Sequence, residues 1–141
     1  MFSPKKVIVH HSLTKDGETV SWGAIRHYHT TLPPEGLGMT DIGYHAGIEL
    51  VKSGDYLYYE ILLGRMWNEV GAHTKGENHN SLGLCFVGNY DLIAPSESML
   101  KIGASLVAFW LKLFKLGVED VYGHNHFADK TCPGSMFSVI K

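Results

Sequence analysis

Short apolar runs predict the strands of this chain. Five segments carry the β-branched and aromatic residues typical of buried strands: Lys5–His11, Tyr44–Val51, Tyr56–Leu63, Leu82–Val87 and Val118–Gly123. The second and third segments are expected to pair, because Lys52–Asp55 between them is typical of a hairpin connection. The first segment contains the run Val7–Val9 and ends in two adjacent histidines, His10 and His11.

The stretch after Pro95 predicts the longest helix. Ser96 is a typical N-cap residue, and Gly117 is expected to end the helix. The apolar residues between them recur at helical spacing: Met99, Ile102, Gly103, Leu106, Val107, Trp110 and Leu113. A helix with one apolar side is expected to pack against the sheet.

Two shorter helical segments are also predicted. Ser21 is expected to cap a helix whose apolar side carries Trp22, Ile25 and either Tyr28 or His29. Near the end of the chain, Pro133 is expected to begin a helical turn that carries Phe137 and Ile140.

Turn-forming residues mark the connections. Lys15–Gly17 predicts a turn, Thr30–Asp41 a loop, and Val70–Ser81 an ordered surface loop. Strands and helices mixed in this order predict the α/β class. We expect a mixed central β-sheet flanked by helices, in a single domain over residues 1–141.

Composition and charge narrow the possible functions. The 141 residues are 45% hydrophobic and 18% charged, which suits one globular domain. A net charge of −2 gives no broad basic surface for nucleic acid. The longest apolar stretch, Ala104–Phe114, contains Lys112 and is too short for membrane insertion. Met1–Lys6 does not begin a secretory signal, so we expect the protein to stay in the cytoplasm where it is made.

Nine histidines are the first indication of chemistry. Thiolate sulfur and neutral imidazole are favoured zinc ligands. A catalytic zinc site needs three protein ligands and a fourth position left for water. His124 and Cys132 are eight residues apart and can converge across a loop, although spacing alone also admits His126. A third ligand can come from His10 or His11, only one of which can face the metal because side chains alternate along a strand. A disulfide between Cys85 and Cys132 is disfavoured without an export signal.

Two other enzyme classes fit the sequence poorly. The contiguous triplet 124–126, His-Asn-His, has the residues that name a nuclease motif, but in those nucleases they are spread over a larger unit. The His-Glu-x-x-His helix of ordinary zinc proteases is absent from the sequence.

Four segments in register resemble one known family. They are Val7–Ser12, Ile42–His45, Val70–Gly83 and Gly123–Gly134, which together extend from residue 7 to residue 134. They are similar to the zinc-dependent N-acetylmuramoyl-L-alanine amidases, which share a fold with peptidoglycan recognition proteins. The resemblance is greatest to the small lytic amidases of tailed bacteriophages.

The resemblance implies a role for six residues. The positions that match the family's zinc ligands select His10 over His11 and His124 over His126, with Cys132 as the third ligand of one zinc ion per chain. Tyr44 and Lys130 match the catalytic positions beside the zinc, and His73 matches a position that lines the substrate groove.

The implied activity is hydrolysis of the amide bond between the lactyl group of N-acetylmuramic acid and L-alanine in peptidoglycan, by a phage or prophage lytic enzyme. Zinc would activate a water molecule, while Tyr44 and Lys130 stabilise the oxyanion. The alternative is a non-catalytic recognition domain, in which the position of Cys132 is usually altered. We expect a monomer that reaches the cell wall through another factor; phage-type members can also contact a polymerase.

Overall fold

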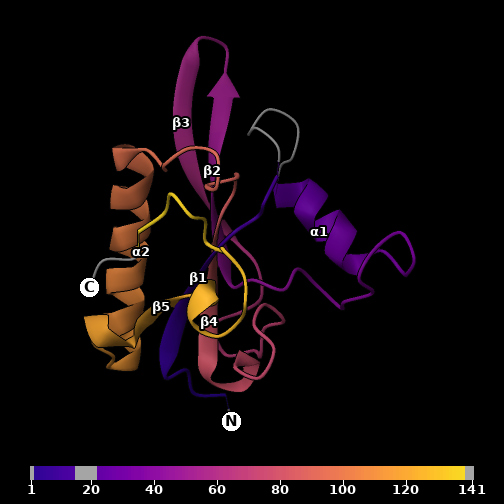
Figure 1. Cartoon of the computed structure of the whole chain (residues 1–141), viewed down its shortest axis with the longest axis vertical. Helices are drawn as coiled ribbons and strands as arrows, with labels where there is room; N and C mark the ends of the chain where they lie inside the picture. Colours follow the sequence, from indigo (N-terminus) through magenta and orange to yellow (C-terminus); the bar gives the residue numbers. More distant parts are fainter. Residues whose placement is uncertain (1, 15–21, 139–141) are drawn as a thin grey trace.

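The computed structural model describes residues 2–14 and 22–138, and a mixed five-stranded sheet forms the centre of this part (Figure 1). The strands are β1 (Lys6–His11), β2 (Ala46–Ser53), β3 (Tyr56–Leu63), β4 (Ser81–Phe86) and β5 (Val121–Gly123). Their order is β3-β2-β4-β1-β5. β1 runs parallel to β4 and β5, β2 runs parallel to β4, and only the predicted hairpin β2–β3 is antiparallel. The predicted mixed α/β sheet is confirmed.

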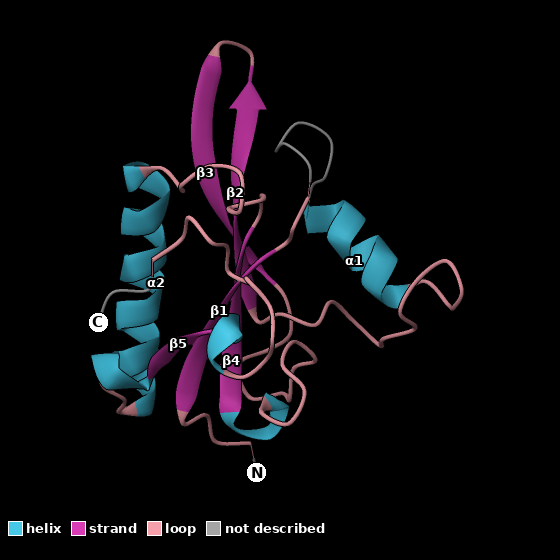
Figure 2. Cartoon of the chain, in the orientation of Figure 1, coloured by secondary structure: helices cyan, strands magenta, loops and turns pink. Residues whose placement is uncertain are grey.

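In the described part of the chain, two α-helices lie on opposite sides of this sheet (Figure 2). They are α1 (Trp22–Thr30) and α2 (Glu97–Phe114). Three short 3-10 helices lie in the connections: η1 (Asn78–Asn80), η2 (Val118–Asp120) and η3 (His124–His126). Within the described ranges, neither helix is long and apolar enough to cross a membrane.

The face of the sheet under α2 holds the larger apolar core. Val7 and Val9 of β1 join alternate residues of β4 and the fully buried Trp110 of α2 in one cluster. Gly103 lets the helix approach closely, because a Cβ there would lie 2.4 Å from the ring of Phe86. Ser96 caps the helix as predicted, since its hydroxyl accepts a hydrogen bond of 3.1 Å from the backbone N–H of Met99.

The opposite face, under α1, mixes a smaller apolar cluster with polar side chains. Trp22 and Ile25 of α1 pack with Cys85 of β4. On this side of the sheet β1 contributes His10. On α1, His29 is buried whereas Tyr28 is 52% exposed, which decides between the two predicted alternatives.

Three predicted features near the C-terminus are wrong. The longest helix ends at Phe114, three residues before Gly117, because Lys115 takes a left-handed conformation (φ 57°) and its N–H caps the carbonyl of Leu111. The first half of the predicted strand 118–123 is the 3-10 helix η2, since the Asp120 carboxylate binds the Gly117 N–H at 2.8 Å. After Pro133, the described residues 134–138 form a hydrogen-bonded turn, with the Phe137 N–H donating to the carbonyl of Gly134 at 3.0 Å, and not a helix.

Phe137 packs instead against Phe86, with ring centroids 4.9 Å apart. The predicted turn Lys15–Gly17, the Ser21 cap and Ile140 lie outside the described residues.

Candidate metal centre and active site

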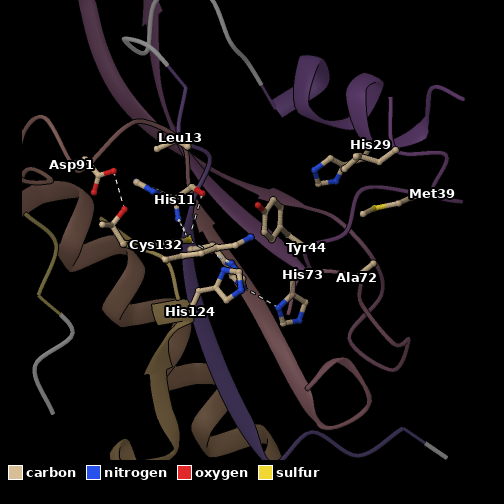
Figure 3. A pocket seen from close by; sticks show the side chains of 14 residues that line it. His11, Leu13, His29, Met39, Tyr44, Ala72, His73, Asp91, His124 and Cys132 are labelled. Carbon is tan, nitrogen blue, oxygen red and sulfur yellow. Dashed lines mark hydrogen bonds between the residues drawn. The ribbon is translucent and has the colours of Figure 1, made fainter. Parts of the chain in front are cut away.

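A cavity of about 600 Å³ opens where β1 and β5 end (Figure 3). All six residues singled out in the sequence line it: His10, Tyr44, His73, His124, Lys130 and Cys132. Segments far apart in the chain therefore contribute to one site. The parallel pairing of β1 with β5 explains part of this, because parallel strands end at the same edge of a sheet.

His10, His124 and Cys132 form a group of potential metal ligands. Their ligand atoms all lie within 4.8 Å of one another, and Cys132 Sγ is 3.7 Å from His10 Nδ1. Zinc bonds of about 2.0–2.3 Å in tetrahedral geometry separate neighbouring ligand atoms by roughly 3.3–3.7 Å. The separation of Cys132 and His10 therefore fits such an ion, and all three side chains have the chemistry that zinc prefers.

His11 points away from this group. Its Nδ1 accepts a hydrogen bond of 3.1 Å from the backbone N–H of Tyr90, whereas its own backbone N–H donates to Cys132 Sγ at 3.4 Å. The alternation expected along β1 thus directs one histidine into the ligand group. The backbone of the other contacts the sulfur.

His126 also lies outside the ligand group. Its ring packs against Tyr122 and Phe127, with centroids 4.8 Å away in each case. The backbone N–H of Asn125 between the two histidines donates to the carbonyl of Cys132 at 2.7 Å. This bond ties the segment after β5 to the loop that carries the sulfur.

Asp91 holds that loop from the other side, a role that the sequence did not reveal. Its carboxylate accepts from the Ser135 N–H at 2.7 Å and from the Thr131 hydroxyl at 2.9 Å. These bonds lower the pKa of Asp91, the Ser135 N–H most strongly. Asp91 follows β4 and has no sequence motif with Cys132, so only the fold brings them together.

Burial decides the charge of the ligand group. It lowers the pKa of His10 well below 6.5, and the neighbouring His73 and His124 lower it further. It raises the pKa of the Cys132 thiol to about 11, opposed by the His11 N–H and the Lys130 ammonium. The imidazoles of the ligand group are therefore neutral and can bind a cation. A bound cation would in turn favour the thiolate form of Cys132.

Tyr44 lies beside the ligand group, just before β2. The centroid of its ring lies 5.2 Å from the ring centroid of His10 and 5.6 Å from that of His29. Burial, with Cys85 and Cys132 nearby, raises the pKa of Tyr44 well above 10.0. The phenol therefore stays protonated and can donate a hydrogen bond.

His73 lines the cavity from the loop between β3 and β4. Its Nδ1 lies 2.9 Å from His10 Nε2, and burial lowers its pKa to about 3. The backbone N–H groups of His73 and Thr74 both donate to the Asn78 side chain at 2.9 Å. These bonds hold the loop predicted at Val70–Ser81, although its last residues form η1 and Ser81 already begins β4.

Comparison with known proteins identifies the family. The family described as N-acetylmuramoyl-L-alanine amidase matches residues 2–135. This chain belongs to that amidase family. The resemblance seen in the four sequence segments is thus confirmed.

Two sequence relatives and one solved structure show how far the similarity to known proteins extends. The chain is 35% identical over 107 residues to peptidoglycan-recognition protein LB of Drosophila melanogaster, covering 73% of the chain but only 42% of that protein. It is 31% identical over 137 residues to the endolysin of Escherichia phage T7, covering 93% and 81%. The fold matches the amidase LysC from Clostridium intestinale with a TM-score of 0.78 at 22% identity, over 96% and 80% of the two chains.

Proposed function

We propose that the chain is a zinc-dependent N-acetylmuramoyl-L-alanine amidase. The convergence of His10, His124 and Cys132 at one end of the sheet is the observation that carries the proposal. Two neutral imidazoles and one thiolate are a zinc-preferring set, and three protein ligands leave one coordination position open. The family match over residues 2–135 supports the same activity.

The proposed reaction cleaves the amide bond between the lactyl group of N-acetylmuramic acid and L-alanine. When bound, zinc supplies Lewis-acid polarisation of the carbonyl and a water of lowered pKa. The Tyr44 hydroxyl and the Lys130 ammonium both face the same cavity, where they stabilise the negative charge that develops on the carbonyl oxygen. One of them, or a bridging water, also protonates the leaving alanine nitrogen.

The remaining walls suit a stem peptide of peptidoglycan. A volume of about 600 Å³ lies within the range of roughly 300–1,000 Å³ typical of ligand sites. Leu37 and Met39 add an apolar wall, and His73 contributes a ring at the groove for contact with substrate. The amidase and recognition-protein relatives, whose names refer to the same polymer, support peptidoglycan as the substrate.

Product analysis tests this function. Purified sacculi are digested with the zinc-loaded protein, and the soluble products are identified by mass spectrometry. We expect intact stem peptides that begin with a free alanine amino group. Binding to sacculi without release of peptides would identify a recognition domain, and cleavage inside the stem would identify a peptidase; either result overturns the proposal.

The other expectations stay predictions. They are a single amidase domain over residues 1–141, a monomeric state, synthesis in the bacterial cytoplasm with release to the wall by another factor, and, in phage-type members, contact with a polymerase.

A further inference from the structure

The two ring nitrogens of His10 have different neighbours. Nδ1 lies 3.7 Å from Cys132 Sγ, on the side of the proposed metal. Nε2 lies on the far side, 2.9 Å from His73 Nδ1 and 3.3 Å from the hydroxyl oxygen of Thr74. The hydroxyl is itself 3.0 Å from His73 Nδ1, so the three groups form a closed triangle.

The arrangement admits one consistent assignment of protons when Nδ1 of His10 binds a cation. A neutral imidazole has one proton, which must then sit on Nε2 and be donated. His73 Nδ1 and Thr74 Oγ1 both accept from it, and the Thr74 hydroxyl uses its own proton to donate to His73. The proton of His73 is then on Nε2, a buried atom on the side of the Ser81 backbone.

Tight packing holds the triangle in place. Thr74 is only 2% exposed. A Cβ at Gly83 would lie 2.6 Å from the His73 ring, and a Cβ at Gly71 would lie 2.7 Å from it. The ring therefore occupies space that two glycines leave free, and a side chain at either position would collide with it.

We propose that Thr74 and His73 are positioning residues for the zinc ligand His10. Together they fix its ring orientation and keep its proton on Nε2, which leaves the Nδ1 lone pair directed at the metal. Partners of this kind typically contribute 10- to 100-fold, in rough terms, to metal affinity. The proposal rests on the zinc site proposed above.

The Thr74 hydroxyl can be removed without disturbing the loop. The backbone N–H of Thr74 is bound by Asn78, and that bond is independent of the side chain. Thr74→Val keeps the shape and deletes the hydroxyl, whereas Thr74→Ser keeps the hydroxyl. Thr31→Val is a matched control, because the Thr31 hydroxyl donates to the carbonyl of His27 and, within residues 2–14 and 22–138, has no contact with the ligand group.

The test is the zinc dissociation constant of the full chain, measured by competition with a chelator. We expect Thr74→Val to weaken zinc binding by roughly 10- to 100-fold, with Thr74→Ser and Thr31→Val close to the parent. In the cobalt-substituted protein, the visible absorption bands of Thr74→Val should shift, which a merely structural role would not cause.

The outcomes separate the two proposals. If the parent chain binds no zinc, the proposed metal centre itself fails. If the parent binds zinc and Thr74→Val binds it equally tightly with an unchanged cobalt spectrum, only the positioning role is overturned. If Thr74→Val does not fold, the same triangle is tested by comparing His73→Leu with His73→Asn. Asparagine retains an acceptor near the position of Nδ1, whereas leucine does not. Equal zinc affinity of these two variants would overturn the positioning role.

Discussion

The two faces of the central sheet differ in what they bury. The face under α2 buries apolar side chains such as Val9, Leu84 and Trp110, which form the larger core. The face under α1 buries His10 and Cys85, and His10 is oriented toward the other ligands at the end of the sheet. Because successive residues of a strand point to opposite faces, β1 contributes to both regions at once. One short strand thus supplies packing to one face and a metal ligand to the other.

Cys132→Ser should have the largest effect on the α1 face. The hydroxyl is a much poorer zinc ligand than a thiolate, so bound zinc should drop sharply and release of stem peptides should fall below detection. Zinc content and product formation are measured together. Cys85→Ala removes the other free thiol and should retain both; lysis by a zinc-free Cys132→Ser protein would contradict the assignment.

Trp110→Ala should have the largest effect on the α2 face. Removing this fully buried ring should lower the free energy of unfolding by about 3–5 kcal/mol, as judged by urea denaturation. The folded fraction should still bind zinc with the parent affinity. A loss of zinc affinity in the folded fraction would show that the two faces are coupled.

Lys130→Ala should separate catalysis from metal binding. Loss of its ammonium should reduce the rate roughly 100-fold, in the range found for single oxyanion-stabilising groups. Zinc should stay bound, because Lys130 is not among the three ligands. Lys75→Ala serves as the control, because Lys75 is also exposed. Equal rates of peptide release by the two variants would refute the catalytic role of Lys130.

Lowering the pH should destabilise the zinc-free protein through the buried histidines. The pKa of His73 is about 3 in the folded chain and 6.5 when exposed, so the unfolded chain takes up protons first. This contribution to stability is complete above pH 6.5 and is lost as the pH falls toward 3. Between pH 7 and pH 5 the free energy of unfolding should fall by about 2 kcal/mol from His73 alone, and His73→Leu should flatten the dependence.

His126→Ala should have the smallest effect. Its exposed ring packs on the neighbouring rings of Tyr122 and Phe127, so stability should change by less than about 0.5 kcal/mol. Zinc binding should persist, whereas His124→Ala should abolish it. Zinc loss in both variants would mean that the ligand lies elsewhere in this segment.

The sequence predicted the strands of the sheet and the start of α2 because these features depend on local patterns. Ser96 is an N-cap by its own chemistry, and the run Val7–Val9 is a strand by composition. The end of α2 was misjudged because Lys115 adopts a conformation usually left to glycine. The segment after Pro133 was misjudged because Phe137 is fixed by long-range packing.

The site was only partly predictable for the same reason. Strand alternation required that only one of His10 and His11 face the metal, but the choice between them came from family resemblance. Asp91 and Thr74 were missed because their partners, Thr131 and His10, lie 40 and 64 residues away in the chain. Such contacts exist only once the sheet has brought the strand ends together.

Zinc K-edge X-ray absorption on the purified chain probes the proposed metal centre itself. We expect one ion per chain with a single sulfur ligand at about 2.3 Å and two imidazole nitrogens at about 2.0 Å. A spectrum without a sulfur ligand, or with two sulfur ligands, would contradict a centre built from His10, His124 and Cys132.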